Sequence, residues 1–185
     1  SVPGLPQAEP SLKITYVQPK DFTGLLRYVR NILVVTIDPT AYTKVSVGYE
    51  NNVWARGQVV VSLKAPNTES IVEYSKTHEK ALVDFFVKVE MNRAIEQLQK
   101  EYSMVVMDNL KSDLNVMLNA PANFTYYKDT TDFFWSSNNA NTGRMDLIVY
   151  TFPYTDPNTF TEEYLVAKRD SVLKANLPGS FPGSY

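Results

Sequence analysis

The sequence predicts an α+β protein in which helices pack on an antiparallel-rich sheet. Three observations lead to this prediction. Short apolar runs rich in β-branched residues alternate with turn residues in both halves of the chain. Residues 67–111 contain no glycine or proline and repeat apolar residues every three or four positions, which indicates a long or kinked helix. A Thr-x-x-Glu capping box at Thr159 opens a second helical pattern over residues 159–175.

The first forty residues predict a strand, a helix and a second strand. Leu12–Val17 alternates weakly and contains β-branched residues, which favours a short strand. Asp21 is a suitable N-cap for a helix, and the apolar stripe of that helix consists of Phe22, Leu25, Leu26 and Val29. Ile32–Ile37 is a nearly continuous apolar run, which is typical of a buried central strand.

Two further strands are expected before the long helix. Tyr42–Val47 and Gln58–Leu63 are rich in strand-forming residues, and Gly48–Asn52 between them has the composition of a turn. One unbroken helix over residues 67–111 would extend roughly 60 Å, which is too long for a domain of this size. We therefore expect a break near Ser75–Thr77, with Thr77 as the N-cap of a second helix that runs to about Lys111.

The last third of the chain predicts a group of strands followed by a helix. Leu114–Leu118, Phe124–Tyr127 and Phe133–Ser136 are expected to be strands, and Asn138–Gly143 is expected to be a hairpin loop. The next strand, Arg144–Phe152, carries apolar residues on both faces and is therefore expected to be central.

The length of 185 residues indicates one domain, or one domain and a fragment. Residues 1–11 include three prolines and are expected to form an extended N-terminal segment. Residues 12–177 are expected to form a single α+β domain, followed by a C-terminal extension at 178–185.

Composition excludes several classes of function. A net charge of −2 gives no general attraction to nucleic acid or to an anionic membrane. The absence of cysteine excludes disulfides, thiolate metal sites and cysteine nucleophiles. No phosphate-binding glycine loop and no Gly-x-Ser-x-Gly sequence occurs, so we predict no cofactor, no metal and no nucleic-acid partner, and we nominate no catalytic residue.

The single histidine and the acidic residues offer little for catalysis. His78 lies on the apolar stripe of the long helix near its expected break, which favours a packed or capping role over a metal ligand or a base. Glu162 and Glu163 are adjacent, so their side chains point about 100° apart on a helix and cannot converge. A pair of carboxylates assembled from distant loops remains the alternative.

Aromatic residues supply the one candidate binding signal. Eleven of them lie between Phe124 and Tyr164. Successive strand residues face opposite sides, so rings such as Tyr126, Tyr127 and Trp135 cannot all be buried by one layer. They are expected either to stack on a sugar or anchor a partner, or to be covered by helices or by a further part of the protein. Arg30, at the first helix-to-strand junction, is expected either to hold its loop or to bind an anion.

Several long segments resemble a known family. They are Leu147–Asp156, Asn158–Leu165 and Lys168–Val172, together with Arg30–Leu33 and Val53–Ala55. The chain is similar in these segments to a family of uncharacterised lipoproteins from Bacteroidetes, which is known only as a domain of unknown function. This resemblance implies a lipid-anchored protein of the cell envelope, either periplasmic or exposed at the surface. Its only membrane contact would be an N-terminal anchor whose cysteine is absent from this sequence.

Members of that family continue past the Gly-Ser-Tyr element into a further β-rich half, whereas this sequence ends at Tyr185. The resemblance therefore implies either a truncated product or a shorter member. The function expected first is a non-enzymatic envelope lipoprotein domain that acts as a binding or interaction module for a protein or a glycan. The alternatives are a carboxylate-dependent hydrolase of envelope polysaccharide or peptide, and a structural half of a larger protein.

Overall fold

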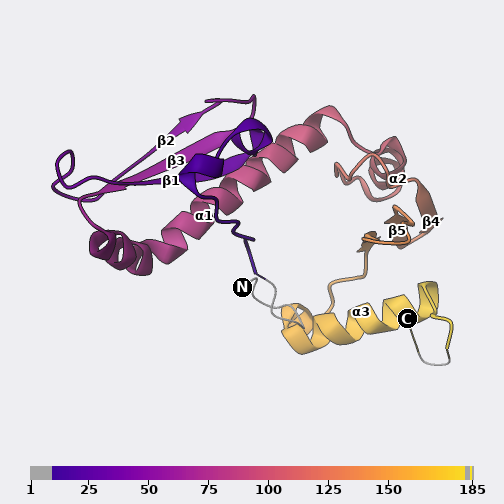
Figure 1. Ribbon diagram of the computed structural model, residues 1–185. Helices are drawn as coiled ribbons and strands as arrows, with labels where there is room; N and C mark the ends of the chain where they lie inside the picture. Colours follow the sequence, from indigo (N-terminus) through magenta and orange to yellow (C-terminus); the bar gives the residue numbers. More distant parts are fainter. Residues whose placement is uncertain (1–9, 182–183, 185) are drawn as a thin grey trace. The chain divides into compact units, whose positions relative to one another are not determined.

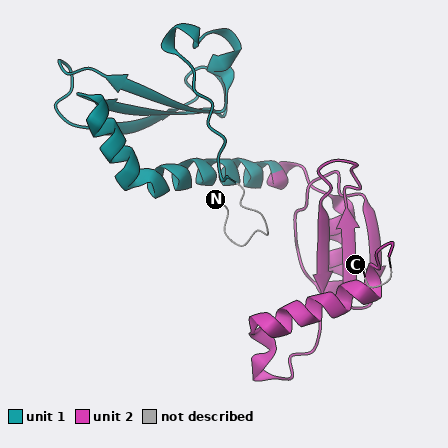
Figure 2. Ribbon diagram, turned by 60° about the horizontal axis from the view of Figure 1, so that its bottom comes forward, with its two compact units in different colours: residues 1–97 teal, residues 98–185 magenta. Residues whose placement is uncertain are grey.

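The computed structural model describes residues 10–181 and 184, and the chain divides into two compact units, Ser1–Gln97 and Leu98–Tyr185 (Figures 1 and 2). Each unit contains its own three-stranded sheet, where the sequence analysis expected one domain over residues 12–177. Most of the expected extended segment 1–11, and residues 182, 183 and 185 of the expected extension 178–185, lie outside the described residues. The α+β class, the long kinked helix and the C-terminal helix are confirmed.

The sheet of the first unit is built around its last strand. Its strands are β1 (Asn31–Ile37), β2 (Ser46–Asn51) and β3 (Val59–Ala65), in the order β1-β3-β2. β3 runs parallel to β1 and antiparallel to β2, and five of its seven residues are buried. The prediction that the run Ile32–Ile37 is central was therefore wrong, because this strand lies at an edge.

The segment before β1 differs from its prediction. No strand forms over Leu12–Val17, and two short 3-10 helices, Pro19–Asp21 and Gly24–Tyr28, replace the α-helix expected from Asp21. Gly24 has a φ of 53°, a left-handed conformation that a right-handed helix cannot continue. The Gln58 side chain closes this segment by donating hydrogen bonds to the carbonyl oxygens of Arg27 (2.6 Å) and Val29 (2.7 Å).

Strand β2 begins four residues later than predicted. It covers Ser46–Asn51, so the expected turn Gly48–Asn52 falls almost wholly inside it. The actual reversal follows at Asn52–Gly57, where both of these residues have positive φ and the Asn52 side chain accepts a hydrogen bond from the Gly57 amide (2.6 Å).

The long helix α1 (Thr68–Lys100) packs against one face of this sheet (Figure 1). The Asn67 side chain accepts a hydrogen bond from the Ser70 amide at its start, and His78 interrupts the helical conformation with φ −116° and ψ 16°. This kink lies one residue beyond the predicted break at Ser75–Thr77. Thr77 is not an N-cap, because its hydroxyl donates to the Glu73 carbonyl oxygen one turn earlier.

A polar cluster joins α1 to the start of β1. Glu90 Oε1 accepts hydrogen bonds from Asn31 Nδ2 (2.5 Å) and Arg93 Nη1 (2.6 Å), and Arg93 also donates to Asn31 Oδ1 (2.8 Å) and to the Arg30 carbonyl oxygen (3.2 Å). Burial raises the pKa of the Glu90 carboxyl, but the Asn31 hydrogen bond and the guanidinium groups of Arg30 and Arg93 more than offset this. The pKa of Glu90 therefore lies below its ordinary value.

The second unit has helices on both faces of its sheet. Its strands, β4 (Tyr126–Thr130), β5 (Phe133–Ser137) and β6 (Asp146–Tyr150), are antiparallel in the order β4-β5-β6. Helix α2 (Met104–Leu114) covers one face, where the buried core consists of Val106, Leu110, Ala120, Phe124 and Phe134. Helix α3 (Glu162–Asn176) contacts the other face near Phe133 and Tyr150.

Several elements of this unit differ from the predictions, including β4, which covers Tyr126–Thr130 where a strand was expected over Phe124–Tyr127. The long helix ends at Lys100 and α2 begins anew after Ser103, whose hydroxyl accepts a hydrogen bond from the Val106 amide. Leu114–Leu118 is not a strand, because Asn115 ends α2 in a left-handed conformation. The strand expected to be central over Arg144–Phe152 is the edge strand β6. The N-cap of α3 is Thr161 and not Thr159. The loop predicted at Asn138–Gly143 is confirmed.

No helix in the described part of the chain is both long and apolar enough to cross a lipid bilayer.

The Glu90 cluster generates a test of stability. Glu90→Gln is expected to lower the free energy of unfolding at pH 7 by about 0.5–1 kcal/mol, a value reduced because the side chain is one-third exposed. A depressed carboxyl pKa stabilises the fold above the unfolded pKa of about 4.3, and this stabilisation is lost as the pH falls through the folded pKa.

Denaturant unfolding at pH 7 and pH 3 measures this effect, with Glu96→Gln, exposed elsewhere on α1, as the control. If Glu90→Gln lowers the free energy of unfolding equally at both pH values, the lowered pKa of Glu90 is not what stabilises the fold.

Candidate functional site

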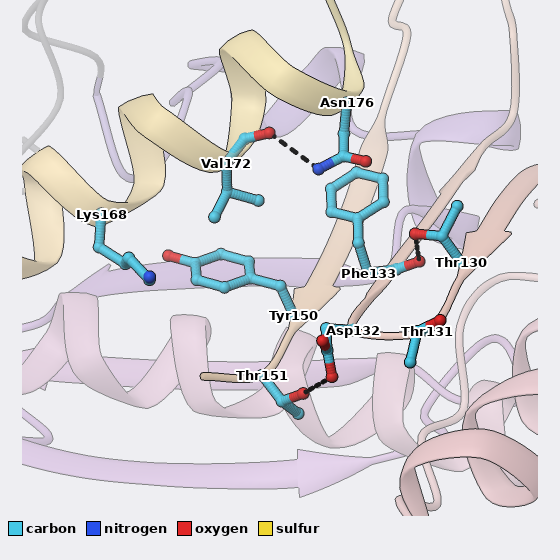
Figure 3. A pocket seen from close by; sticks show the side chains of 9 residues that line it. All are labelled: Thr130, Thr131, Asp132, Phe133, Tyr150, Thr151, Lys168, Val172 and Asn176. Carbon is cyan, nitrogen blue, oxygen red and sulfur yellow. Dashed lines mark hydrogen bonds between the residues drawn. The ribbon is translucent and has the colours of Figure 1, made fainter. Parts of the chain in front are cut away.

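A cavity of about 340 Å³ lies between the sheet of the second unit and α3 (Figure 3). This volume is at the lower end of the range of about 300–1,000 Å³ that is usual for small-molecule sites. Three segments far apart in the sequence line it: the β4–β5 turn, the end of β6, and one face of α3. All three belong to the second unit.

The sheet side of the cavity is held by the β4–β5 turn. The Asp132 carbonyl oxygen accepts a hydrogen bond from the Thr151 amide (3.0 Å), and the Thr151 hydroxyl donates to Asp132 Oδ1 (3.3 Å). The Thr130 hydroxyl donates to the Phe133 carbonyl oxygen (3.3 Å) across the same turn. These bonds join the end of β6 to the turn, so the Asp132 carboxylate has a defined position at the cavity edge (Figure 3).

The helix side is formed by residues at a spacing of four. Lys168, Val172 and Asn176 follow one another on successive turns of α3 and therefore lie on one face. The Asn176 side chain donates to the Val172 carbonyl oxygen (3.1 Å), which orients its amide. Lys128 Nζ, on β4, donates to the Asn176 backbone oxygen (2.7 Å) and so holds the end of α3 on the sheet.

Two aromatic rings separate these walls. Phe133 is buried, and Tyr150 pairs with it across β5 and β6 on the face opposite Phe134. Figure 3 shows the Tyr150 ring extending beneath α3 toward Lys168. The Lys168 ammonium lies 5.0 Å from the centre of the Phe152 ring, a cation–π distance. The cavity thus combines ring surfaces with a carboxylate, an amide, an ammonium group and three threonine hydroxyls.

The structure separates the four residues predicted as a binding site. Tyr126 and Trp135 lie on the same sheet face as the cavity, whereas Tyr127 lies on the α2 face and stacks on Phe134 at 6.4 Å. Arg30 belongs to the first unit, where its Nη2 lies 3.9 Å from Glu90 Oε2. That these residues bind a ligand stays a prediction.

Trp135 has a structural partner for its polar group. Its Nε1 donates to Asp146 Oδ1 (2.9 Å), and Arg144 Nε and Nη2 donate to the same carboxylate. Burial raises the pKa of Asp146, but the Arg144, Ser137 and Trp135 hydrogen bonds outweigh it and keep the pKa below its ordinary value. Asp146 is therefore a charged anchor for the Trp135 ring at neutral pH.

Sequence reasoning did not nominate the cavity residues Asp132, Tyr150, Lys168 and Asn176 as part of a site. The available signal was the spacing of Lys168, Val172 and Asn176, which places polar ends and an apolar centre on one helix face. His78 is exposed, with Nδ1 3.0 Å from the Tyr74 carbonyl oxygen and its ring stacked on Tyr74. Among residues 10–181 and 184, no group of three side chains suited to a metal ion occurs.

Two carboxylates meet on the opposite face of the sheet. The hydrogen bond to Asp113, on α2, raises the pKa of Asp129, on β4. Hydrogen bonds from the Ser112 hydroxyl (2.7 Å) and from Asp129 lower the pKa of Asp113. The two groups therefore share a proton at acidic pH and repel each other once both are ionised.

Asp129→Asn is expected to raise the melting temperature at pH 7 by about 1–2 °C, because an amide donates to Asp113 without adding charge. A raised carboxyl pKa contributes stability below the unfolded pKa, and this is lost as the pH rises through the folded pKa. The advantage of Asp129→Asn should therefore disappear below about pH 4.

Thermal unfolding between pH 3 and pH 8 measures this effect, and Asp108→Asn, exposed on α2, serves as the control. If the melting temperatures of both variants change with pH in the same way, the hydrogen bond between Asp113 and Asp129 is contradicted.

Comparison with known families gives one match for each part of the chain. Residues 103–185 match the family described as Domain of unknown function (DUF4837), and residues 1–99 match that described as Domain of unknown function (DUF8532). No curated protein and no solved structure matches the chain. The two matched ranges meet close to the boundary between the compact units, and the expectation of an uncharacterised domain is confirmed. Since the DUF8532 match, over residues 1–99, covers more than half of the 185 residues, this chain belongs to the DUF8532 family.

Proposed function

We propose that this chain is a non-enzymatic binding module of the cell envelope and that the cavity beside α3 binds a segment of glycan. The observation that carries the proposal is the combination of the Phe133 and Tyr150 rings with hydrogen-bonding side chains of both polarities around them. A sugar presents apolar C–H faces together with hydroxyl groups that both donate and accept hydrogen bonds. Ring surfaces complement the former, and mixed polar groups complement the latter.

Each polar group has a distinct use in this proposal. The Asp132 carboxylate accepts hydrogen bonds, the Lys168 ammonium donates them, and the threonine hydroxyls do both. Carboxylate and ammonium stand on opposite walls (Figure 3), so a ligand with hydroxyls on two sides can engage both.

The same face of the sheet offers a continuation of the site. Along β5, the residues on this face are Phe133 in the cavity, then Trp135 and Ser137. Tyr126 pairs with Ser137, so its exposed ring lies two side-chain repeats, or about 13 Å, from the cavity floor. A glycan longer than the cavity therefore has a second ring on which to stack.

The envelope location is supported by the sequence resemblance to Bacteroidetes lipoproteins. In that setting the N-terminal lipid is the only attachment to the membrane, and the ligand is an envelope glycan. Metabolic labelling of the complete protein in its host with a palmitate analogue tests this. Label should be incorporated and should be lost when the anchor cysteine is replaced, and an unlabelled protein would contradict the location.

The hydrolase alternative is less well supported by the geometry. A glycosidase needs two carboxyl groups about 5–9.5 Å apart in one site. Among the nine residues that line the cavity, all within the described part of the chain, Asp132 is the one carboxylate. The hydrogen-bonded pair Asp113 and Asp129 lies on the other face of the sheet. Binding is therefore the function that the cavity supports best.

Amide NMR shifts during titration with a panel of soluble oligosaccharides test the proposal. At least one oligosaccharide should shift the amides of β5, β6 and α3. Asp132→Asn and Tyr150→Ala should each weaken its binding about tenfold, the effect expected for one lost charged hydrogen bond or ring contact.

Tyr154→Ala is the matched control, since Tyr154 is exposed outside the cavity and stacks on Phe160. Equal weakening by Tyr154→Ala, or no shifts at millimolar oligosaccharide, would refute the site. Release of shorter sugars would instead support the hydrolase.

A further inference from the structure

The outer edge of β1 has backbone groups available for another strand. In the parallel ladder with β3, the Arg30 carbonyl oxygen accepts from the Val59 amide and the Asp38 amide donates to the Ala65 carbonyl oxygen. Even-numbered residues of β1 therefore point their amide and carbonyl groups toward β3. Those of Asn31, Leu33, Val35 and Ile37 point away, and no described residue forms a hydrogen bond with them.

This edge is also the most apolar of the four sheet edges. From Asn31 to Ile37 it contains no charge, glycine or proline, and Leu33, Val35 and Ile37 are 45%, 48% and 46% exposed. The other outer strands carry residues that discourage pairing. These are Gly48 and Glu50 in β2, Lys128 and Asp129 in β4, and Asp146 at the start of β6.

The sequence of β1 is complementary to itself in the antiparallel direction. Strands pair only where outward-pointing residues of one copy meet outward-pointing residues of the other. Centring the pairing on Val34 satisfies this rule and uses all seven residues, with Leu33 opposite Val35 and Asn31 opposite Ile37 of the second copy. The same register places Arg30, whose side chain is 71% exposed, opposite Asp38 of the second copy, once at each end.

We propose that two copies of this chain associate by antiparallel pairing of their β1 strands about a two-fold axis at Val34. Pairing joins the two three-stranded sheets into one of six strands. The axis is perpendicular to the sheet, so both α1 helices lie on the same side. Leu33 and Val35 become cross-strand neighbours there and lose part of their exposure. This interface is independent of the cavity and of the ligand proposed for it.

Analytical ultracentrifugation of the unmodified protein is the first test. A reversible equilibrium is expected between 21.0 kDa and twice that mass. The dissociation constant should be micromolar, because one strand pair buries less than a standard interface of about 1,600 Å². A monomer at all concentrations up to about 200 μM would overturn the proposal.

Cysteine cross-linking tests the register, and the chain has no cysteine of its own. Two thiols introduced by Val34→Cys would face each other at a Cα separation of about 4.5 Å, within the range for a disulfide. Thr36→Cys is the matched control, since Thr36 is opposite Ile32 of the second copy and its two thiols would be about 13 Å apart. Val34→Cys should give at least tenfold more disulfide-linked dimer, and equal cross-linking would overturn the register.

Charge reversal tests the ends of the interface. Arg30→Asp places like charges opposite each other at both ends and should weaken dimerisation about tenfold at low salt, with a smaller effect at high salt. Arg56→Asp, exposed outside β1, is the control for net charge, and circular dichroism checks the fold of both variants. Equal dimerisation of the two variants would overturn the predicted pairing of Arg30 with Asp38.

Discussion

Each unit depends on a single strand that has to be shielded from water on both faces. In the first unit this strand is β3, and in the second it is β5, where Phe133 and Phe134 are buried on opposite sides. A sheet of three strands gives only its middle strand a neighbour on each side, so the remaining cover comes from helices. That cover ends toward the sheet edges. The exposed side chains of Leu33, Val35 and Ile37 on β1 lie at one such edge, and the cavity beside β6 lies at another.

Local sequence patterns predicted which elements form better than where they lie in a sheet. The kink of α1 at His78, one residue from the expected position, follows from the length of the apolar repeat and is a local property. The runs Ile32–Ile37 and Arg144–Phe152 are indeed strands, but apolar residues on both faces wrongly suggested central positions for them. The order of strands in a sheet is decided by pairing between distant segments, so the composition of one strand does not predict whether it is central or at an edge. The left-handed Gly24 was likewise not apparent in a run that has helical spacing.

The candidate site was harder to predict because three separate segments create it. Lys168 stands in the charged stretch Lys168–Asp170, where a solvated side chain is the usual expectation. Only the packing of α3 on the sheet brings it over Phe152 and close to Tyr150. Conversely, the abundance of rings drew attention to Trp135, whose indole is engaged with Asp146. Aromatic composition drew attention to the part of the chain that contains the cavity, while the cavity itself depends on contacts between residues 16 to 48 positions apart.

The two sides of the cavity differ in how they are held. Backbone ladders and the bonds between Thr151 and Asp132 make the sheet side rigid. The opposite side is fastened through lysine ammonium groups, from Lys128 to the last turn of α3 and from Lys168 to the Phe152 ring. Long lysine side chains can change rotamer and remain in contact while a helix shifts by a fraction of its diameter. One wall of the cavity is therefore fixed while the other can shift, so under the proposed binding role the same residues would accept ligands of different thickness.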